Sequence, residues 1–191
     1  MKLFISLIGL LTLWATVLNS GSINKIWVYP DLIETAKIPN IQSTAAVRID
    51  PVQLNCMSKN IYFEAAVEST AGKLAVAQVT MNRVRSSRYP DSICEVVYEG
   101  RHDASGFPLR DRCQFSWYCD GKGDEPRDTP AWRESQEIAE YIIRTPSLID
   151  ITDGSTHYHA DYIDAPRWAK KKKRLVKIDT HIFYKPKKWR H

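Results

Sequence analysis

The sequence DPVQLNCMSKNIYFEAAVE, residues 50–68, carries the clearest helix signal in the chain. Asp50 followed by Pro51 is typical of a helix start, because an aspartate side chain can cap the first N–H groups and proline fits the first turn. Apolar side chains then recur every three or four residues, which places them on one helix face: Leu54, Met57, Ile61 and Ala65. The pattern predicts an amphipathic helix that ends near Glu68 and packs this face into a core.

Three more helices and a β region are predicted further along the chain. Apolar residues at helical spacing mark the second helix: Leu74, Ala77, Met81 and Val84. A short third helix follows Pro90, and Thr129-Pro130 repeats the start signal for a fourth. Residues 100–128 are rich in glycine and proline, which predicts a long irregular stretch of the kind that usually carries function. Alternation with a period of two begins at Thr156, and a second β-like run spans residues 175–184. The expected fold class is α+β, with helices followed by a small antiparallel sheet.

Length, composition and charge narrow the class of protein. The chain has 191 residues, of which 43% are hydrophobic, so we expect one folded domain of ordinary size and exclude wholesale disorder. Residues 167–191 carry 11 Lys/Arg against one acidic residue, whereas residues 1–166 carry 16 Lys/Arg against 21 Asp/Glu. A mildly acidic body with a strongly basic end differs from the uniformly cationic surface of a nucleic-acid-binding protein.

The N-terminus has the features of an export signal. Residues 3–18 are apolar and uncharged, and this run is shorter than the roughly 20 residues that a spanning helix needs. Ser20-Gly21-Ser22 is a weak match to the small-residue site at which signal peptides are cleaved. We therefore predict a signal peptide or a retained signal anchor over residues 1–24, and export to the periplasm or cell envelope. The expected organisation continues with a linker over 25–49, the folded domain over 50–185 and a basic tail over 186–191.

Four cysteines agree with export, because an even number in an exported domain is typical of disulfides. Cys113 and Cys119 bracket a short segment and could close a small loop, which leaves Cys56 to pair with Cys94. Three connectivities are possible for four cysteines, and the spacing favours this one. A zinc site is the alternative, but the chain lacks the close Cys-x-x-Cys pair that such a site uses.

Glu64 is the first candidate for chemistry. It follows the stripe residue Ile61 by three positions and stands among apolar neighbours, so we expect it to point into or along the apolar helix face. Burial raises the pKa of a carboxylic acid, which is what a general acid for glycosidic cleavage needs near neutral pH. Glu68 lies one helical turn further and is expected on the same side. On spacing alone, two solvated acids at a helix end are the more common interpretation.

Several segments together resemble the SleB-like cell wall hydrolase family of the spore-cortex-lytic type. The resemblance starts with Asn60–Glu68, Gly72–Val79 and Asn82–Val84. It continues in order through five further segments: Arg88–Cys94, Cys113–Ser116, Thr156–Ala160, Pro166–Ala169 and His181–Tyr184. It therefore covers the chain from about Leu54 to Lys185. One difference lies at Ala66-Val67, where the family often has Arg-Gly before the second glutamate.

The resemblance implies a lysozyme-like α+β catalytic domain that acts on the glycan strands of peptidoglycan without a cofactor or metal. Members resemble lytic transglycosylases, and Glu64 matches the catalytic glutamate of the family. It would protonate the oxygen between N-acetylmuramic acid and N-acetylglucosamine, and then deprotonate the muramoyl 6-hydroxyl to give a 1,6-anhydro product. Hydrolysis, as a muramidase would perform it, would instead need a second carboxylate or a positioned water. Glu68 is the nearest candidate, and Asp111 and Asp120 are weaker ones.

Other residues are candidates for substrate binding. The segment Gln114, Phe115 and Ser116, with Trp117 and Tyr118 after it, could line a sugar groove, although Trp117 and Tyr118 could equally pack around a disulfide. His157 and His159 share one face of a predicted strand and could ligate a metal; the resemblance favours a polar groove wall, with Trp168 also in contact with substrate. Tyr158 faces the opposite side and is expected in the core.

A basic run near the C-terminus points to anionic partners: Lys170, Lys171, Lys172, Lys173 and Arg174. Such a run is often a solvated hairpin turn, and it also matches nucleic-acid-binding tracts. An exported protein would meet anionic envelope polymers or a membrane surface before nucleic acid, so we expect the former and a monomer. Two alternatives to an exported peptidoglycan-cleaving enzyme remain: a non-catalytic envelope-binding module, and a basic nucleic-acid-binding protein.

Overall fold

The computed structural model describes residues 48–187. The chain divides into two units, Met1–Thr44 and Ala45–His191, and the description that follows concerns the second. The predicted signal segment, most of the predicted linker and the end of the basic tail lie outside the described residues. Within residues 48–187, no helix has the length and apolar character needed to cross a membrane.

Four helices form where the sequence predicts them: α1 (Pro51–Ala65), α2 (Thr70–Val84), α3 (Ile93–Val97) and α4 (Pro130–Arg144). Each begins after a residue whose side chain accepts a hydrogen bond from a backbone N–H of the first turn: Asp50, Ser69, Ser92 and Thr129. The first helix ends at Ala65 rather than near Glu68.

The predicted apolar face of α1 forms the centre of the main core. Met57, Ile61 and Ala65 have at most 1% of their surface exposed, and α1 contacts α2, α3 and α4. The disulfide between Cys56 and Cys94 joins α1 to the start of α3. The second predicted pair, Cys113 with Cys119, is also bonded.

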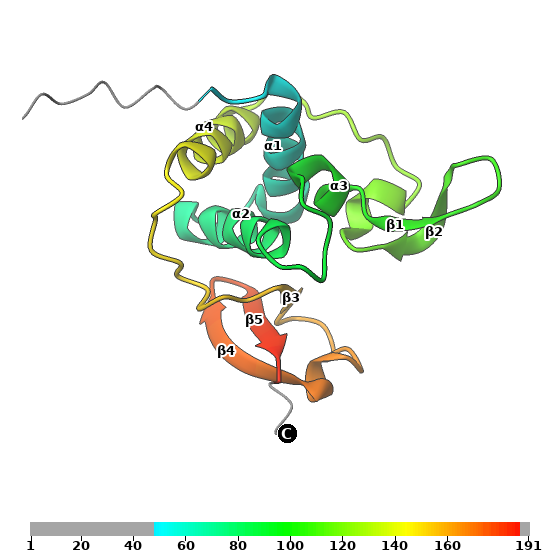
Figure 1. The fold of residues 1–191 in the computed structure, drawn as a ribbon, viewed down its shortest axis with the longest axis vertical. Helices are drawn as coiled ribbons and strands as arrows, with labels where there is room; N and C mark the ends of the chain where they lie inside the picture. The colour runs from blue at the N-terminus through cyan, green and yellow to red at the C-terminus, as the bar shows by residue number, and fades with distance from the viewer. Residues whose placement is uncertain (1–47, 188–191) are drawn as a thin grey trace, which may run out of the picture. The chain divides into compact units, whose positions relative to one another are not determined.

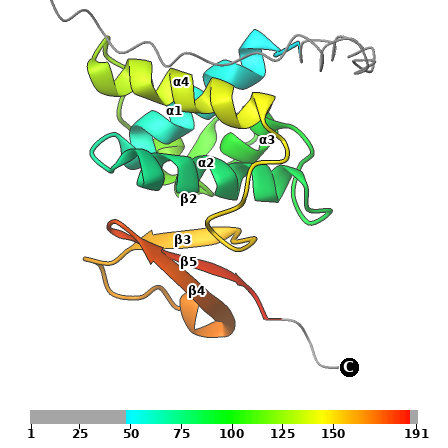
Figure 2. The ribbon, with the colours of Figure 1, turned by 90° about the vertical axis from the view of Figure 1, so that its left-hand side faces the viewer.

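A three-stranded antiparallel sheet packs against the helices (Figures 1 and 2). Its strands are β3 (His157–Ala160), β4 (Lys172–Ile178) and β5 (His181–Pro186), in the order β3-β5-β4. Ala75 and Val79 of α2 form a second core with Phe183 of β5. Helix α2 is therefore buried on both sides, by the other helices and by the sheet.

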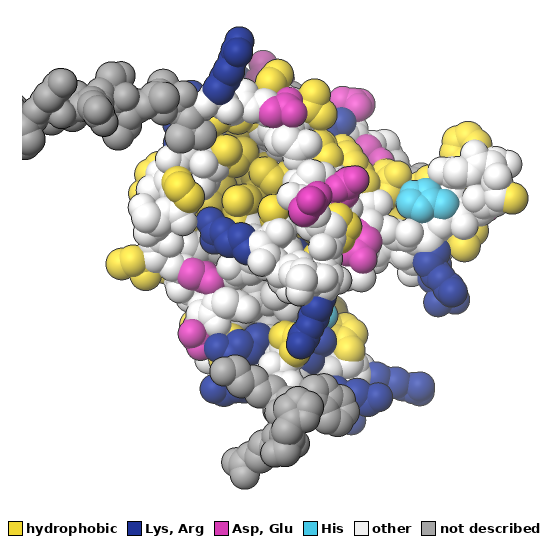
Figure 3. Space-filling view, in the orientation of Figure 1, with side chains coloured by type: hydrophobic (Ala, Val, Ile, Leu, Met, Phe, Trp, Pro, Cys, Tyr) yellow, Lys and Arg dark blue, Asp and Glu magenta, His cyan; other side chains and the backbone are white. Residues whose placement is uncertain are grey.

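The β region differs from the prediction in its turn. Residues 175–184 are not one run, because β4 and β5 are separated at Asp179 and Thr180. Asp179 has a φ of 46°, and aspartate is among the few residues that tolerate this left-handed conformation in a tight turn. The basic run is consequently not the hairpin turn: Lys170 and Lys171 end the short η3 helix (Ala169–Lys171), and the run then opens β4. Figure 3 shows the resulting gathering of Lys and Arg over the sheet.

The stretch expected to be irregular contains a hairpin, β1 (Gly100–His102) with β2 (Pro108–Cys113), followed by the short η2 helix (Ser116–Cys119). The Asp103 carboxylate accepts hydrogen bonds from the N–H groups of Ser105 and Phe107 and so shapes the turn. The hairpin strands are largely exposed, so they lack the alternating burial by which a strand is recognised in sequence.

Candidate active site

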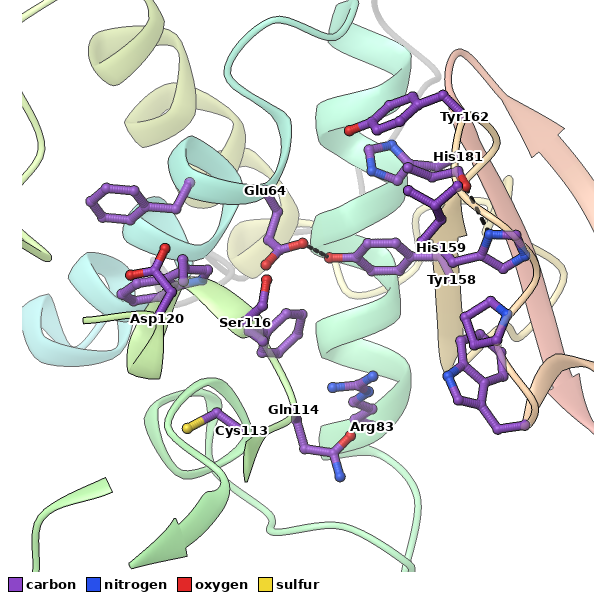
Figure 4. A pocket seen from close by; sticks show the side chains of 17 residues that line it. Glu64, Arg83, Cys113, Gln114, Ser116, Asp120, Tyr158, His159, Tyr162 and His181 are labelled. Atoms are coloured by element: carbon purple, nitrogen blue, oxygen red, sulfur yellow. Dashed lines mark hydrogen bonds between the residues drawn. The ribbon is translucent and has the colours of Figure 1, made fainter. Parts of the chain in front are cut away.

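A cleft of about 480 Å³ opens between the helices and the sheet. Its walls come from segments far apart in the sequence: the end of α1, the C-terminal part of α2, residues 113–120, β3 with the loop that follows, and the start of β5. Figure 4 shows Glu64 entering the cleft from α1 and Arg83 from α2, opposite Tyr158 of β3. The fold therefore brings the predicted acid into a cavity lined by both layers.

Glu64 is half-buried in the last turn of α1. Its Oε2 accepts a 2.9 Å hydrogen bond from the Tyr158 hydroxyl. Burial raises the pKa of the Glu64 carboxyl, and this effect outweighs the Tyr158 hydrogen bond and the charge of Arg83, which both lower it. The protonated form of Glu64 therefore persists to higher pH than that of an exposed glutamate.

Tyr158 is a site residue that the sequence interpretation placed only in the core. It does pack against Phe183 and edge-on against His181, but its hydroxyl reaches the cleft and holds Glu64. Burial and the nearby Glu64 raise the pKa of Tyr158 well above its ordinary value, so the hydroxyl stays a hydrogen-bond donor. Both residues were expected on core-facing sides of their elements, and the cleft lies where these two sides meet.

Arg83 is a second functional candidate that had no assigned role. It is 4% exposed and lines the cleft. Its Nε donates a 2.9 Å hydrogen bond to the Thr156 carbonyl oxygen, and its guanidinium lies over the rings of Tyr89 and Phe115, at 5.5 and 4.7 Å from their centroids. Its Nη1 is buried and has no hydrogen-bond partner among residues 48–187.

The predicted sugar-binding segment divides into cleft and core. Gln114 and Ser116 are exposed and line the cleft, whereas Phe115 lines it as a buried side chain that also supports Arg83. Trp117 is 6% exposed; its indole N–H donates to Asn60 Oδ1, and its ring stacks on Phe63. Tyr118 lies outside the cleft, in contact with Trp117. The packing interpretation therefore fits Tyr118, whereas Trp117 is packed by these contacts and also lines the cleft.

The two strand histidines share one face, as predicted, because both rings contact Trp168, at 5.4 and 5.9 Å between centroids. His159 and Trp168 line the cleft, but His157 lies outside it. Both ring nitrogens of His159 are in hydrogen-bond contact, Nδ1 with the Ala160 carbonyl at 2.8 Å and Nε2 with the Tyr184 hydroxyl at 3.0 Å. Burial, with the charges of Lys172 and Arg83, lowers the pKa of His157 to about 3, so this ring is neutral. The described part of the chain holds no cluster of three or more His, Cys, Asp or Glu side chains suited to a metal ion.

Glu68 does not accompany Glu64 in the cleft, which corrects the expectation that both acids lie on one side. Because α1 ends at Ala65, the chain turns before Glu68, and its carboxylate accepts hydrogen bonds from the Thr180 hydroxyl (2.6 Å) and N–H (3.2 Å). Glu68 thereby ties the α1–α2 turn to the β4–β5 turn.

The two weaker acid candidates also separate. Asp111 is exposed on the β1–β2 hairpin and lies outside the cleft. Asp120 lines the cleft and is the other acidic side chain that does so within residues 48–187. The Lys122 backbone N–H donates to Asp120 and is the main cause of the lowered pKa of its carboxyl, so Asp120 is ionised. An ion pair with the Lys122 side chain at 3.3 Å adds to this effect.

The fold and the site together define an α+β protein with a half-buried carboxylic acid in a cleft between its helices and its sheet. The chain belongs to the cell wall hydrolase family, whose sequence profile matches residues 67–184. The matched segment begins three residues after Glu64, so the role of Glu64 depends on its geometry and on the resemblance of the residues around it.

The chain is also similar in sequence to two spore cortex-lytic enzymes. The spore cortex-lytic enzyme of Oceanobacillus iheyensis is 24% identical over 153 residues, which cover 80% of this chain and 48% of that protein. The spore cortex-lytic enzyme of Halalkalibacterium halodurans is 26% identical over 130 residues, which cover 68% and 34%. The chain thus spans half or less of the length of these relatives.

Two solved structures share the fold. The catalytic domain of the Bacillus cereus SleB protein matches with a TM-score of 0.53 at 22% identity, over 73% of this chain and 94% of that one. The catalytic domain of the germination-specific lytic transglycosylase SleB from Bacillus anthracis matches with a TM-score of 0.55 at 24% identity, over 72% and 97%. The predicted α+β fold class is confirmed.

Proposed function

We propose that this protein is an exported enzyme that cleaves the bond between N-acetylmuramic acid and N-acetylglucosamine in the glycan strands of peptidoglycan. Membership of the cell wall hydrolase family supports peptidoglycan as the substrate. The observation that carries the proposal is the environment of Glu64, a carboxyl group held by Tyr158 in a cleft, with a pKa raised by burial. A general acid for glycosidic cleavage needs this combination of access and retained proton.

Glu64 acts first as an acid and then as a base. Since the Tyr158 hydroxyl occupies Oε2, Oε1 carries the proton and donates it to the bridging oxygen as the glycosidic bond breaks. The Glu64 carboxylate then removes the proton of the muramoyl 6-hydroxyl, and that oxygen closes onto the anomeric carbon. The product is a 1,6-anhydro sugar, Glu64 ends protonated, and no water is consumed.

The walls of the cleft suit a glycan strand. Gln114 and Ser116 present an exposed amide and hydroxyl on one side, where sugar hydroxyl and acetamido groups need polar partners. Tyr162, which is 79% exposed, and Trp168 line the cleft from the loop after β3. Aromatic faces of this kind pack against the apolar faces of sugar rings. Tyr162 is a binding candidate that no sequence pattern marked.

Hydrolysis is the second candidate reaction, and Asp120 favours it. An ionised carboxylate in the same cleft as Glu64 could activate a water on the other face of the sugar. We favour the anhydro-forming reaction, because Asp120 is committed to the Lys122 backbone N–H and side chain. Asp120→Asn separates the two: it should abolish hydrolysis and leave an anhydro-forming enzyme active.

Glu64→Gln tests the proposed acid, because glutamine keeps the shape and the acceptor for Tyr158 but has no proton to donate. We expect dye release from labelled peptidoglycan to fall by at least about 10²-fold, the scale of a general acid's contribution. Glu68→Gln is the matched control, since it makes the same change outside the cleft and should keep near wild-type activity. Wild-type rates from folded Glu64→Gln protein would overturn the proposal and leave an envelope-binding module.

The basic side chains over the sheet are proposed to attract anionic envelope polymers or a membrane surface. Lys173 and Arg174 are exposed in β4, and exposed charges of this kind act through a field that salt screens. The expected consequence is faster capture of the enzyme on its substrate at low salt. Nucleic acid is not proposed as a partner.

A further inference from the structure

The positive charge of Arg83 lies in the wall of the cleft, where the charges of Glu99 and Glu64 act on it but neither carboxylate forms an ion pair with it. The side chain is 96% buried, and no carboxylate of residues 48–187 lies within 4.0 Å of its nitrogen atoms. Its Nη1 also lacks a hydrogen-bond partner in the described part of the chain. A buried charge without an ion-pair partner is costly to a fold, so its presence in the same cleft as a proposed acid calls for a functional explanation.

The surroundings of Arg83 hold this charge in place rather than neutralise it. The Thr156 carbonyl accepts from Nε, and the faces of Tyr89 and Phe115 lie on the guanidinium. A carbonyl oxygen and two aromatic faces attract a cation without neutralising it. The Glu99 carboxylate, whose Oε2 is buried without a hydrogen-bond partner within residues 48–187, also attracts it from outside the cleft. On the same helix, by contrast, the buried Lys73 forms an ion pair with Glu134, with 2.7 Å between Nζ and Oε2.

The proposed reaction creates a negative charge in this cleft. When Glu64 gives its proton to the bridging oxygen, the neutral carboxyl becomes a carboxylate, and it becomes neutral again when it takes the proton of the 6-hydroxyl. A fixed cation in the cleft favours the state in which Glu64 is charged, without any reorganisation at the moment of reaction. We propose that Arg83 is the permanent counter-charge for the Glu64 carboxylate during this cycle, a positioning residue that acts through Glu64 rather than on the substrate. The inference deepens the proposed function and rests on it.

Arg83 is the cation whose charge acts on Glu64, and Glu99 and Lys172 act on Arg83 from outside the cleft. Groups lining the cleft come from all of its walls: Arg83, Asp120, Tyr158, His159, Tyr162 and His181. Asp120 is negative, and Tyr158 is held neutral by its raised pKa. Burial lowers the pKa of His181, which keeps it uncharged near neutral pH. Apart from burial, the pKa of Glu64 responds to the Tyr158 hydrogen bond and to the charge of Arg83, and both favour the carboxylate.

Arg83→Met is the direct test, because methionine removes the charge and keeps a long apolar side chain next to the rings of Tyr89 and Phe115. Arg83→Gln is a second neutral variant that keeps a donor for Thr156, and Arg83→Lys restores a cation. Lys73→Met is the matched control, as it removes a buried cation of α2 that lies outside the cleft. The pKa of the Glu64 carboxyl is measured by ¹³C NMR without substrate, and kcat and KM are measured across pH.

We expect the Glu64 pKa and the alkaline limb of kcat to move to higher pH in both neutral variants, because the carboxylate loses its counter-charge. We also expect kcat of both neutral variants to fall roughly 10- to 100-fold with KM nearly unchanged. Arg83→Lys should reverse part of the pKa shift and part of the fall in kcat, and Lys73→Met should show neither change. An unmoved Glu64 pKa in the folded neutral variants, or an equal shift in Lys73→Met, would overturn the inference. Because the NMR titration needs no turnover, that result is distinct from failure of the proposed function, which an active Glu64→Gln variant would reveal.

Discussion

Replacing Cys56 and Cys94 by alanine opens the larger disulfide loop and should destabilise the domain strongly. The bond joins residues 38 positions apart, and the chain-entropy relation for a loop of that length gives about 3.9 kcal/mol at 25 °C. An unfolding entropy of roughly 0.3 kcal/mol/K for a domain of about 140 residues converts this into a fall of about 13 °C in Tm. Cys56 is 4% exposed, so alanine, which is close in size, adds only a small cavity cost.

The second disulfide provides the matched control. Cys113 and Cys119 are six positions apart, for which the same relation gives about 2.2 kcal/mol. Urea unfolding followed by circular dichroism should therefore rank the Cys56/Cys94 variant below the Cys113/Cys119 variant by more than 1 kcal/mol. Equal losses, or a loss below 1 kcal/mol in the first variant, would refute the loop-closure reasoning. Four free thiols in denatured, unreduced protein from the cell envelope would contradict the pairing itself.

Three further predictions concern Tyr158, Glu68 and the exposed basic side chains of β4. Tyr158→Phe removes the donor that stabilises the Glu64 carboxylate, so the alkaline limb of the pH–rate profile should move to higher pH. The value of kcat should fall by about tenfold or more, and an unchanged alkaline limb would argue against this hydrogen bond. Glu68→Ala removes two hydrogen bonds between the α1–α2 turn and the β4–β5 turn. Calorimetry should show a loss of roughly 2 kcal/mol while the folded enzyme keeps its kcat, and lost kcat with unchanged stability would restore Glu68 to the site. The double variant Lys173→Gln/Arg174→Gln should bind isolated sacculi more weakly than the wild-type protein at low salt and equally at high salt. Equal binding of the two proteins at all salt concentrations would exclude the proposed attraction to anionic polymers.

Local patterns predicted the helices well, because a cap and an apolar stripe both lie within one short segment of the sequence. Asp50 with Pro51, and Thr129 with Pro130, mark the starts of α1 and α4. The turn after α1 was not predicted, because Ala66-Val67 contains no helix-stop signal. The sequence therefore did not indicate that Glu68 lies outside the helix and contacts the β4–β5 turn.

The sequence predicted the acid of the candidate site but not the two residues, Tyr158 and Arg83, that act on this acid. Glu64 could be singled out because a carboxylate in an apolar helix face is unusual and because its neighbours resemble a known family. Tyr158 is 94 residues away, and its hydroxyl meets Glu64 only because α1 and β3 face the same cleft. Arg83 is hidden for a similar reason, since its aromatic and carbonyl neighbours come from three separate segments. Alternation shows which side of a strand is buried, but it does not show whether that side meets a core or a cavity.

The bond that the enzyme breaks is the most direct test of the central claim. Purified peptidoglycan is digested with the wild-type protein, and the released muropeptides are analysed by mass spectrometry, with Glu64→Gln protein as the parallel control. We expect fragments that end in 1,6-anhydro-N-acetylmuramic acid, at masses one water below the reducing sugar, in the wild-type digest alone. Intact glycan with cleaved peptide stems, or the same anhydro fragments from the Glu64→Gln protein, would contradict the central claim.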